Sequence, residues 1–115
     1  MPIIKCDPEV TDVFSYILGE EILAVTIFPF IYTKHYETPK YVVNHELIHY
    51  EQYKETLIIG FPIILFINFL INWLYHCDRN IAYRKLLFER EAYENMNNYD
   101  YLKYRKRYSW LFPFK

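Results

Sequence analysis

The stretch His45-Glu46-Leu47-Ile48-His49 places two imidazoles and one carboxylate at the spacing that a catalytic zinc site needs. On a helix, residues four positions apart lie one above the other on the same face. The two histidines can therefore converge on one metal ion while Glu46 lies beside it. We expect His45 and His49 to be metal ligands and Glu46 to act as the general base.

The residues around this motif predict a long helix. Pro39 can begin the helix, and an apolar pattern continues from Tyr41 with no Gly or Pro before Gly60. The motif then lies near the middle of roughly five helical turns. A five-residue motif is a hypothesis until its context agrees with it, and a helical context agrees.

A zinc ion held by two histidines needs a third protein ligand, with the fourth position left for water. Acidic candidates lie in a segment that predicts a second helix from about Asn80 to Asn97. Glu89 falls on the apolar stripe of that helix, whereas Glu91 falls on a more mixed face. The pattern therefore favours Glu89 as the third ligand, with Glu91 as the alternative.

His-Glu-any-any-His followed by a helix that carries Glu-any-Glu-Ala resembles the gluzincin zinc metallopeptidases, and the likeness covers roughly residues 22 to 97. The chain is also similar to small peptidase-like proteins of bacteria and their phages, which have little beyond the metal core. In gluzincins the ligand glutamate often precedes a small residue by three positions, which matches Glu89 with Ala92. The resemblance implies a Zn²⁺ cofactor and a peptide or protein substrate. Hydrolysis would use a zinc-activated water whose proton Glu46 takes and then passes to the leaving amine.

One position departs from the gluzincin pattern. Where many members carry Asp or Asn four residues after the ligand glutamate, this chain has Tyr93. The resemblance makes Tyr93 a candidate for orienting a zinc-bound histidine. The oxyanion of the reaction would need a further donor, for which Tyr93, Tyr99 and His76 are candidates. His76 and His35 also fit the simpler role of capping or solvating the end of an element.

The rest of the chain predicts an α+β fold that is mainly helical, in a single metallopeptidase-like domain of residues 1–115. The segment from Ala24 to Thr33 predicts a strand, and Pro29 favours an edge position or a bulge. The resemblance implies a minimal zincin core, in which an edge strand or small sheet precedes the motif helix and receives the substrate. A helix or strand is expected from about Pro8 to Leu18, and a short helix near the C-terminus.

Residues 57–75 carry no charge and nearly reach the length of a membrane span. One crossing would place His49 and Glu89 on opposite sides of the bilayer, so we expect a buried, interfacial or re-entrant helix instead. A small domain has difficulty covering so much apolar surface, which predicts contact with a membrane surface or an oligomer partner through this segment. Trp73 and Tyr75 are suited to a membrane interface.

Charge and cysteine content bear on the partners and the location of the protein. A net charge of −1 gives no general attraction to nucleic acid, and no nucleic-acid partner is expected. Cys6 and Cys77 are widely separated, and no secretory signal is recognised, so reduced thiols are expected. We expect a bacterial or phage protein that is cytoplasmic or peripherally membrane-associated.

Two other functions stay open at this point. A small membrane-associated interaction or structural protein would explain the apolar segment, but it leaves the glutamate-bearing helix unexplained. A non-catalytic zinc-binding domain would keep the three ligands. Only Glu46 distinguishes that domain from a true peptidase.

Overall fold

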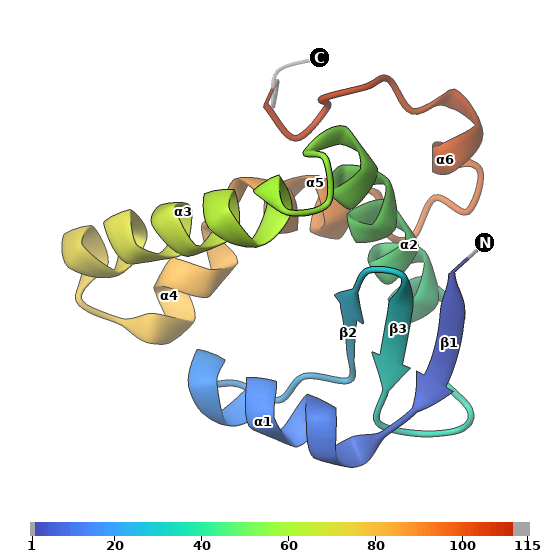
Figure 1. Cartoon of the computed structure of the whole chain (residues 1–115), viewed down its shortest axis with the longest axis horizontal. Coiled ribbons are helices and arrows are strands. Elements are labelled where there is room, and N and C mark those ends of the chain that lie inside the picture. The colour runs from blue at the N-terminus through green and yellow to red at the C-terminus, as the bar shows by residue number, and fades with distance from the viewer. Residues whose placement is uncertain (1, 112–115) are drawn as a thin grey trace.

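The computed structural model describes residues 2–111 and has the α+β, mainly helical fold that the sequence predicts (Figure 1). Three short strands form one sheet in the order β1-β3-β2. Strand β1 (Ile3–Cys6) runs parallel to β3 (Phe30–Thr33), and β2 (Ala24–Ile27) runs antiparallel to it. Helix α1 (Pro8–Leu18) leads from β1 toward the hairpin, which settles the helix-or-strand alternative for that segment in favour of a helix.

The single strand predicted over residues 24–33 is wrong, because this segment folds into a hairpin. Strands β2 and β3 are joined by a tight turn at Phe28 and Pro29. Proline has no backbone N–H to donate to a ladder, so it lies between the strands and not inside one. Strand β2, the first strand of the hairpin, lies at an edge of the sheet, whereas β3, which directly precedes the motif helix, lies in its middle.

Helix α2 (Lys40–Glu55) carries the His-Glu-any-any-His motif and packs on β2. It ends at Glu55, five residues before the predicted limit at Gly60. The Thr56 hydroxyl and N–H both bond to backbone carbonyls of the last turn, and Leu57 and Ile58 then have positive φ values of 58° and 67°. This left-handed turn directs the chain into α3 (Gly60–His76) at a sharp angle to α2.

The single helix predicted from Asn80 to Asn97 is also wrong. The segment forms α4 (Arg79–Arg84) and α5 (Leu87–Asn95), separated at Leu86, whose backbone is extended. The Asn68 side chain of α3 accepts a hydrogen bond of 2.9 Å from the Leu87 N–H. The free N–H groups at a helix start need such partners, so this contact permits the break.

A stack of aromatic rings holds α2, α3 and α5 together. The Phe61 ring stacks on Tyr53 at 3.9 Å and on Phe88 at 4.4 Å between ring centroids. After α6 (Tyr101–Tyr104) the chain returns so that Trp110 packs on Phe88 at 4.7 Å. The core therefore presses α5 against α2, where the histidine motif lies.

The outer face of α3 is apolar and exposed, and Phe61 is the buried residue of this helix. The exposed positions recur at helical spacing: Ile63, Phe66, Ile67, Leu70, Ile71 and Leu74. The buried-helix interpretation of residues 57–75 is therefore wrong. Within residues 2–111, no single helix has the length and apolar character needed to cross a bilayer. Helices α2 and α3 pass that test only as a pair, and they are bent by 108°.

Candidate metal centre

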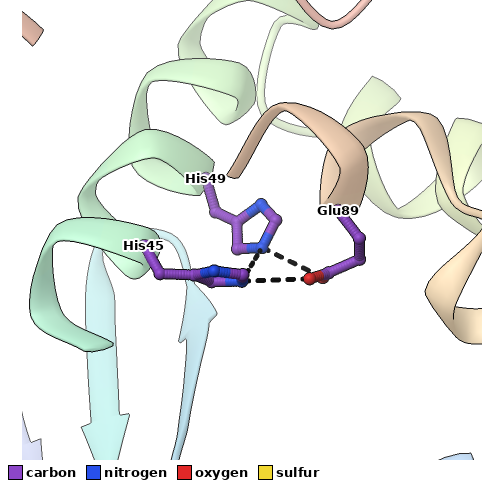
Figure 2. Close-up of side chains that lie close together, drawn as sticks. All are labelled: His45, His49 and Glu89. Carbon is purple, nitrogen blue, oxygen red and sulfur yellow. Dashed lines mark hydrogen bonds and ion pairs between the residues drawn. The ribbon is translucent and has the colours of Figure 1, made fainter. Parts of the chain in front are cut away.

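Three side chains predicted as metal ligands converge between α2 and α5 (Figure 2). The Nε2 atoms of His45 and His49 are 3.2 Å apart. Each of these atoms lies 3.0 Å from a different carboxylate oxygen of Glu89. All three residues are buried. The predicted i, i+4 arrangement of the histidines is confirmed, and of the two glutamates considered, Glu89 is the one that meets them.

The donor set and its spacing fit a divalent metal ion. Nitrogen and oxygen ligands of tetrahedral zinc lie about 2.0–2.2 Å from the metal, which places them roughly 3.3–3.6 Å from one another. The two Nε2 atoms are 3.2 Å apart, near that range, and one ligand atom from each of the three residues lies within 4.8 Å of the others. Imidazole and carboxylate ligands suit several first-row metals, so the geometry supports a metal site without selecting one metal.

The three side chains form a charged cluster. Burial disfavours an imidazolium at His49, but the neighbouring Glu89 carboxylate outweighs it and raises the pKa of His49 to about 9. Burial likewise opposes ionisation of Glu89, yet the two imidazoles hold the pKa of its carboxyl well below the usual range. Without a metal ion, the proton on His49 balances the negative charge of Glu89. A metal ion would have to displace that proton in order to bind.

Gln52 contacts His49 at Nδ1, the ring nitrogen that does not face Glu89. Sequence analysis did not identify Gln52 as part of the site. Its side chain is fully buried, and its Oε1 lies 2.7 Å from Nδ1 of His49. Its amide donates to the Phe88 carbonyl at 3.1 Å and to Glu91 Oε1 at 2.9 Å. The available sequence signal was its position three residues after His49, which places it on the same face of α2.

Glu91, the alternative third ligand, belongs to a different cluster. It is as buried as Glu89, contrary to the mixed helical face predicted for it. Its carboxylate accepts hydrogen bonds from Gln52, Tyr101 and Arg105. These contacts, led by the hydrogen bond from Arg105, lower the pKa of Glu91 despite its burial.

Glu46 lies next to the converging side chains and is 5% exposed. Its Oε1 accepts a hydrogen bond of 2.8 Å from the Thr26 hydroxyl on the edge strand β2. Burial raises the pKa of Glu46 above its ordinary value, and the two neighbouring histidines reduce that rise. Sequence analysis did not identify Thr26, whose role depends on a contact between residues 20 positions apart.

A hollow of about 140 Å³ opens beside Glu46 and His45. Residues of and before strand β2 line one side of it, and Tyr83 and Tyr93 line another. The Tyr93 ring meets the His45 ring edge-on at 4.6 Å, so Tyr93 contacts a predicted ligand through its ring. A larger hollow of about 350 Å³ is lined by Gly19, Trp73 and residues 77–80, and contains none of the converging side chains.

The other residues proposed from the sequence lie outside the His45–His49–Glu89 group. His76 ends α3, and its ring contacts Tyr75. The ring of Tyr99 lies under the ammonium group of Lys40. The carbonyl of His35 accepts hydrogen bonds from two threonine hydroxyls in the loop before α2. Among the described residues, the group that could hold a metal consists of His45, His49 and Glu89 alone.

Comparison with known proteins adds no relative. No protein-family model matches the chain, no curated protein is significantly similar to it, and no solved structure matches it significantly. The identity of the centre therefore rests on the convergence of two histidines and one glutamate from two helices.

Proposed function

We propose that this chain is a zinc-dependent metallopeptidase of the gluzincin type, which hydrolyses peptide bonds in a peptide or protein substrate. The observation that carries the proposal is the position of Glu46. This buried carboxylate adjoins the His45–His49–Glu89 group and faces a hollow bordered by an edge strand. A structural metal site has no need of such a carboxylate.

His45, His49 and Glu89 would hold the zinc ion. When bound, zinc would supply an activated water and polarise the substrate carbonyl. Glu46 would accept the proton of the attacking water on a carboxylate oxygen and later deliver it to the leaving amine. Its pKa is raised, mainly by burial, which makes the Glu46 carboxylate a stronger base than an exposed one.

Strand β2 supplies an edge on which a substrate could pair. The Lys34 N–H donates to the Leu23 carbonyl, so this pair is hydrogen-bonded and pairs alternate from it along the hairpin. The N–H and C=O of Ala24 are then directed away from β3. At Thr26, the next residue that faces this way, the carbonyl accepts a hydrogen bond from the Tyr53 hydroxyl, so a substrate would pair at the start of β2. Leu23 and Ala24 both line the hollow beside His45, so an added strand would bring its backbone to the metal centre.

Two phenols line the same hollow and are candidates for the donor to the oxyanion. Burial raises the pKa of Tyr93 to about 12 and that of Tyr83 well above its ordinary value. Both hydroxyls therefore keep their protons at neutral pH and can donate a hydrogen bond. Tyr83 is an addition to the candidates proposed from the sequence.

The first test is the zinc content of the purified full chain, measured by elemental mass spectrometry. We expect close to one zinc per chain in wild type and loss of zinc in His49→Ala and Glu89→Ala. His76→Ala is the matched control and should keep its zinc, because His76 lies outside the converging group. A wild-type chain that takes up no zinc when zinc is offered would overturn the proposal.

The second test separates a peptidase from a non-catalytic zinc domain. Glu46→Gln should keep zinc and fold, but it should not cleave a fluorogenic peptide library that wild type cleaves. Cleavage that survives this substitution would exclude Glu46 as the general base. A zinc-loaded wild type that cleaves no peptide would favour the non-catalytic domain.

A further inference from the structure

The Gln52 side chain has a single orientation in the core. Its two amide hydrogens are directed at acceptors, the Phe88 carbonyl and Glu91 Oε1, at 3.1 and 2.9 Å. Because an amide nitrogen only donates, its oxygen must be the atom that lies 2.7 Å from Nδ1 of His49. Nδ1 of His49 must therefore carry a hydrogen and donate it.

The hydrogen bond from Nδ1 of His49 to Gln52 determines which ring nitrogen is free to bind a metal ion. Once the second proton of His49 is displaced, the neutral imidazole keeps its hydrogen on Nδ1 and has its lone pair on Nε2. Nε2 is the atom that points at Glu89 and His45, at 3.0 and 3.2 Å. Gln52 thus presents His49 to the centre in the form that a metal ligand requires.

A buried ion cluster holds Gln52 in turn. The guanidinium of Arg105 contacts both oxygens of Glu91, at 2.5 and 3.0 Å, and both oxygens of Glu55, at 2.7 and 2.9 Å. The three side chains are 5%, 3% and 8% exposed, respectively. Arg105 follows α6, so the C-terminal segment is tied to the two helices that carry the converging residues.

We propose that Gln52 is a positioning residue of the metal centre and that Arg105 anchors it through Glu91. The inference rests on the proposed metal site but does not depend on peptide cleavage. Partners of this kind fix the ring orientation and tautomer of a ligand histidine, and their loss typically weakens metal binding about 10- to 100-fold. The position takes an amide because a carboxylate at residue 52 would face the Glu91 carboxylate.

The experiment measures the zinc dissociation constant of the full chain by competition with a chromophoric chelator at constant pH. Gln52→Leu removes the acceptor and should weaken binding about 10- to 100-fold. Gln52→Glu should fold poorly, because it places a second buried carboxylate against that of Glu91. Adding Glu91→Gln turns that neighbour into a donor, so the double variant should fold better than Gln52→Glu alone, with only the Phe88 carbonyl left without its donor. It keeps an acceptor for Nδ1 of His49, and its zinc affinity should be near the wild-type value.

A matched control separates positioning from loss of stability. Asn44 is also a buried amide on α2, but it donates to carbonyls of residues 95, 96 and 98 and not to the histidines. Asn44→Leu should lower the unfolding temperature and leave the zinc dissociation constant unchanged. In zinc-loaded wild type, NMR should detect a slowly exchanging Nδ1–H of His49, which Gln52→Leu should expose to exchange.

The outcomes distinguish this inference from the proposed function. Wild-type affinity in a folded Gln52→Leu variant, or a folded double variant that does not regain zinc affinity, overturns the role of Gln52. If Gln52→Leu does not fold, the double variant alone decides. Failure of wild type to bind zinc overturns the site and the inference together. Normal zinc binding without peptide cleavage overturns only the peptidase.

Discussion

The Thr26 hydroxyl lies 2.8 Å from Oε1 of Glu46, so the edge strand holds the proposed general base in place. The same hydroxyl lies 3.1 Å from the Glu46 backbone carbonyl. One threonine on β2 therefore aligns the strand on which a substrate would pair with the carboxylate that would act on it.

Thr26→Val should lower turnover and shift its pH dependence, while zinc binding is retained. The hydrogen bond from Thr26 favours the ionised form of Glu46 and so lowers its pKa. Its removal raises that pKa, and the acid limb of kcat/KM should move to higher pH. The pH profile of peptide cleavage measures the shift. Thr33→Val, a buried threonine on the adjacent strand, is the control and should leave the profile in place.

Stability of the metal-free protein should fall as pH rises from about 6.5 to about 9. The pKa of His49 is raised from 6.5 to about 9, so the folded chain holds a proton that the unfolded chain releases. The contribution of His49 is therefore complete below pH 6.5 and lost as pH rises through 9. The lowered pKa of Glu89 acts only in the acid range and does not alter this window.

Zinc binding should show the opposite trend and become tighter up to about pH 9, because the ion must displace the His49 proton. Calorimetric titrations in buffers of different ionisation enthalpy would measure the protons released on binding. Unfolding free energies of metal-free and zinc-loaded protein across pH 6 to 9.5 would supply the comparison. An affinity that does not change with pH would contradict the role of His49 as a ligand.

Arg105→Met should destabilise the fold strongly. It leaves Glu55 and Glu91 buried without their cation, a loss that typically costs about 3–5 kcal/mol. Urea unfolding monitored by circular dichroism measures the change. Lys103→Met is the control, since the side chain of Lys103 is 73% exposed in a surface ion pair, and it should have little effect.

Substitutions on the two sides of α3 should differ in their effects on stability. Phe61→Ala removes a ring from the core stack and should cost about 3–5 kcal/mol of unfolding free energy. Phe66→Ala, on the exposed face, should change it by less than about 0.5 kcal/mol. Denaturant titration of both variants beside wild type measures the difference. A comparable loss from Phe66 would contradict its exposed position.

The expected membrane or oligomer contact of residues 57–75 stays a prediction, now located on the outer face of α3. Flotation with lipid vesicles and sedimentation of the free chain would test the two forms of contact. Phe66→Glu should weaken whichever association is found, because it places a charge in the apolar face.

Several differences between expectation and structure have local physical causes. The sequence pattern of residues 24–33 is that of a strand, and only its pairing shows that Pro29 marks a hairpin turn. Strand β1 was missed because its four residues pair with β3, some 27 positions later, and carry no local signal of that partner. The break at Leu86 depends on the Asn68 side chain of another helix, which no periodicity in α4 and α5 contains.

The sequence by itself determined the relation of His45, Glu46 and His49, because spacing along one helix is a local property of the backbone. It also favoured Glu89 by the apolar stripe of its helix. The meeting of Glu89 with the histidines, the support of His49 by Gln52 and the fixing of Glu46 by Thr26 were decided only by the tertiary structure. These contacts depend on how α5 and β2 are rotated and packed against α2, which is set by the core and not by the spacing of residues in either element.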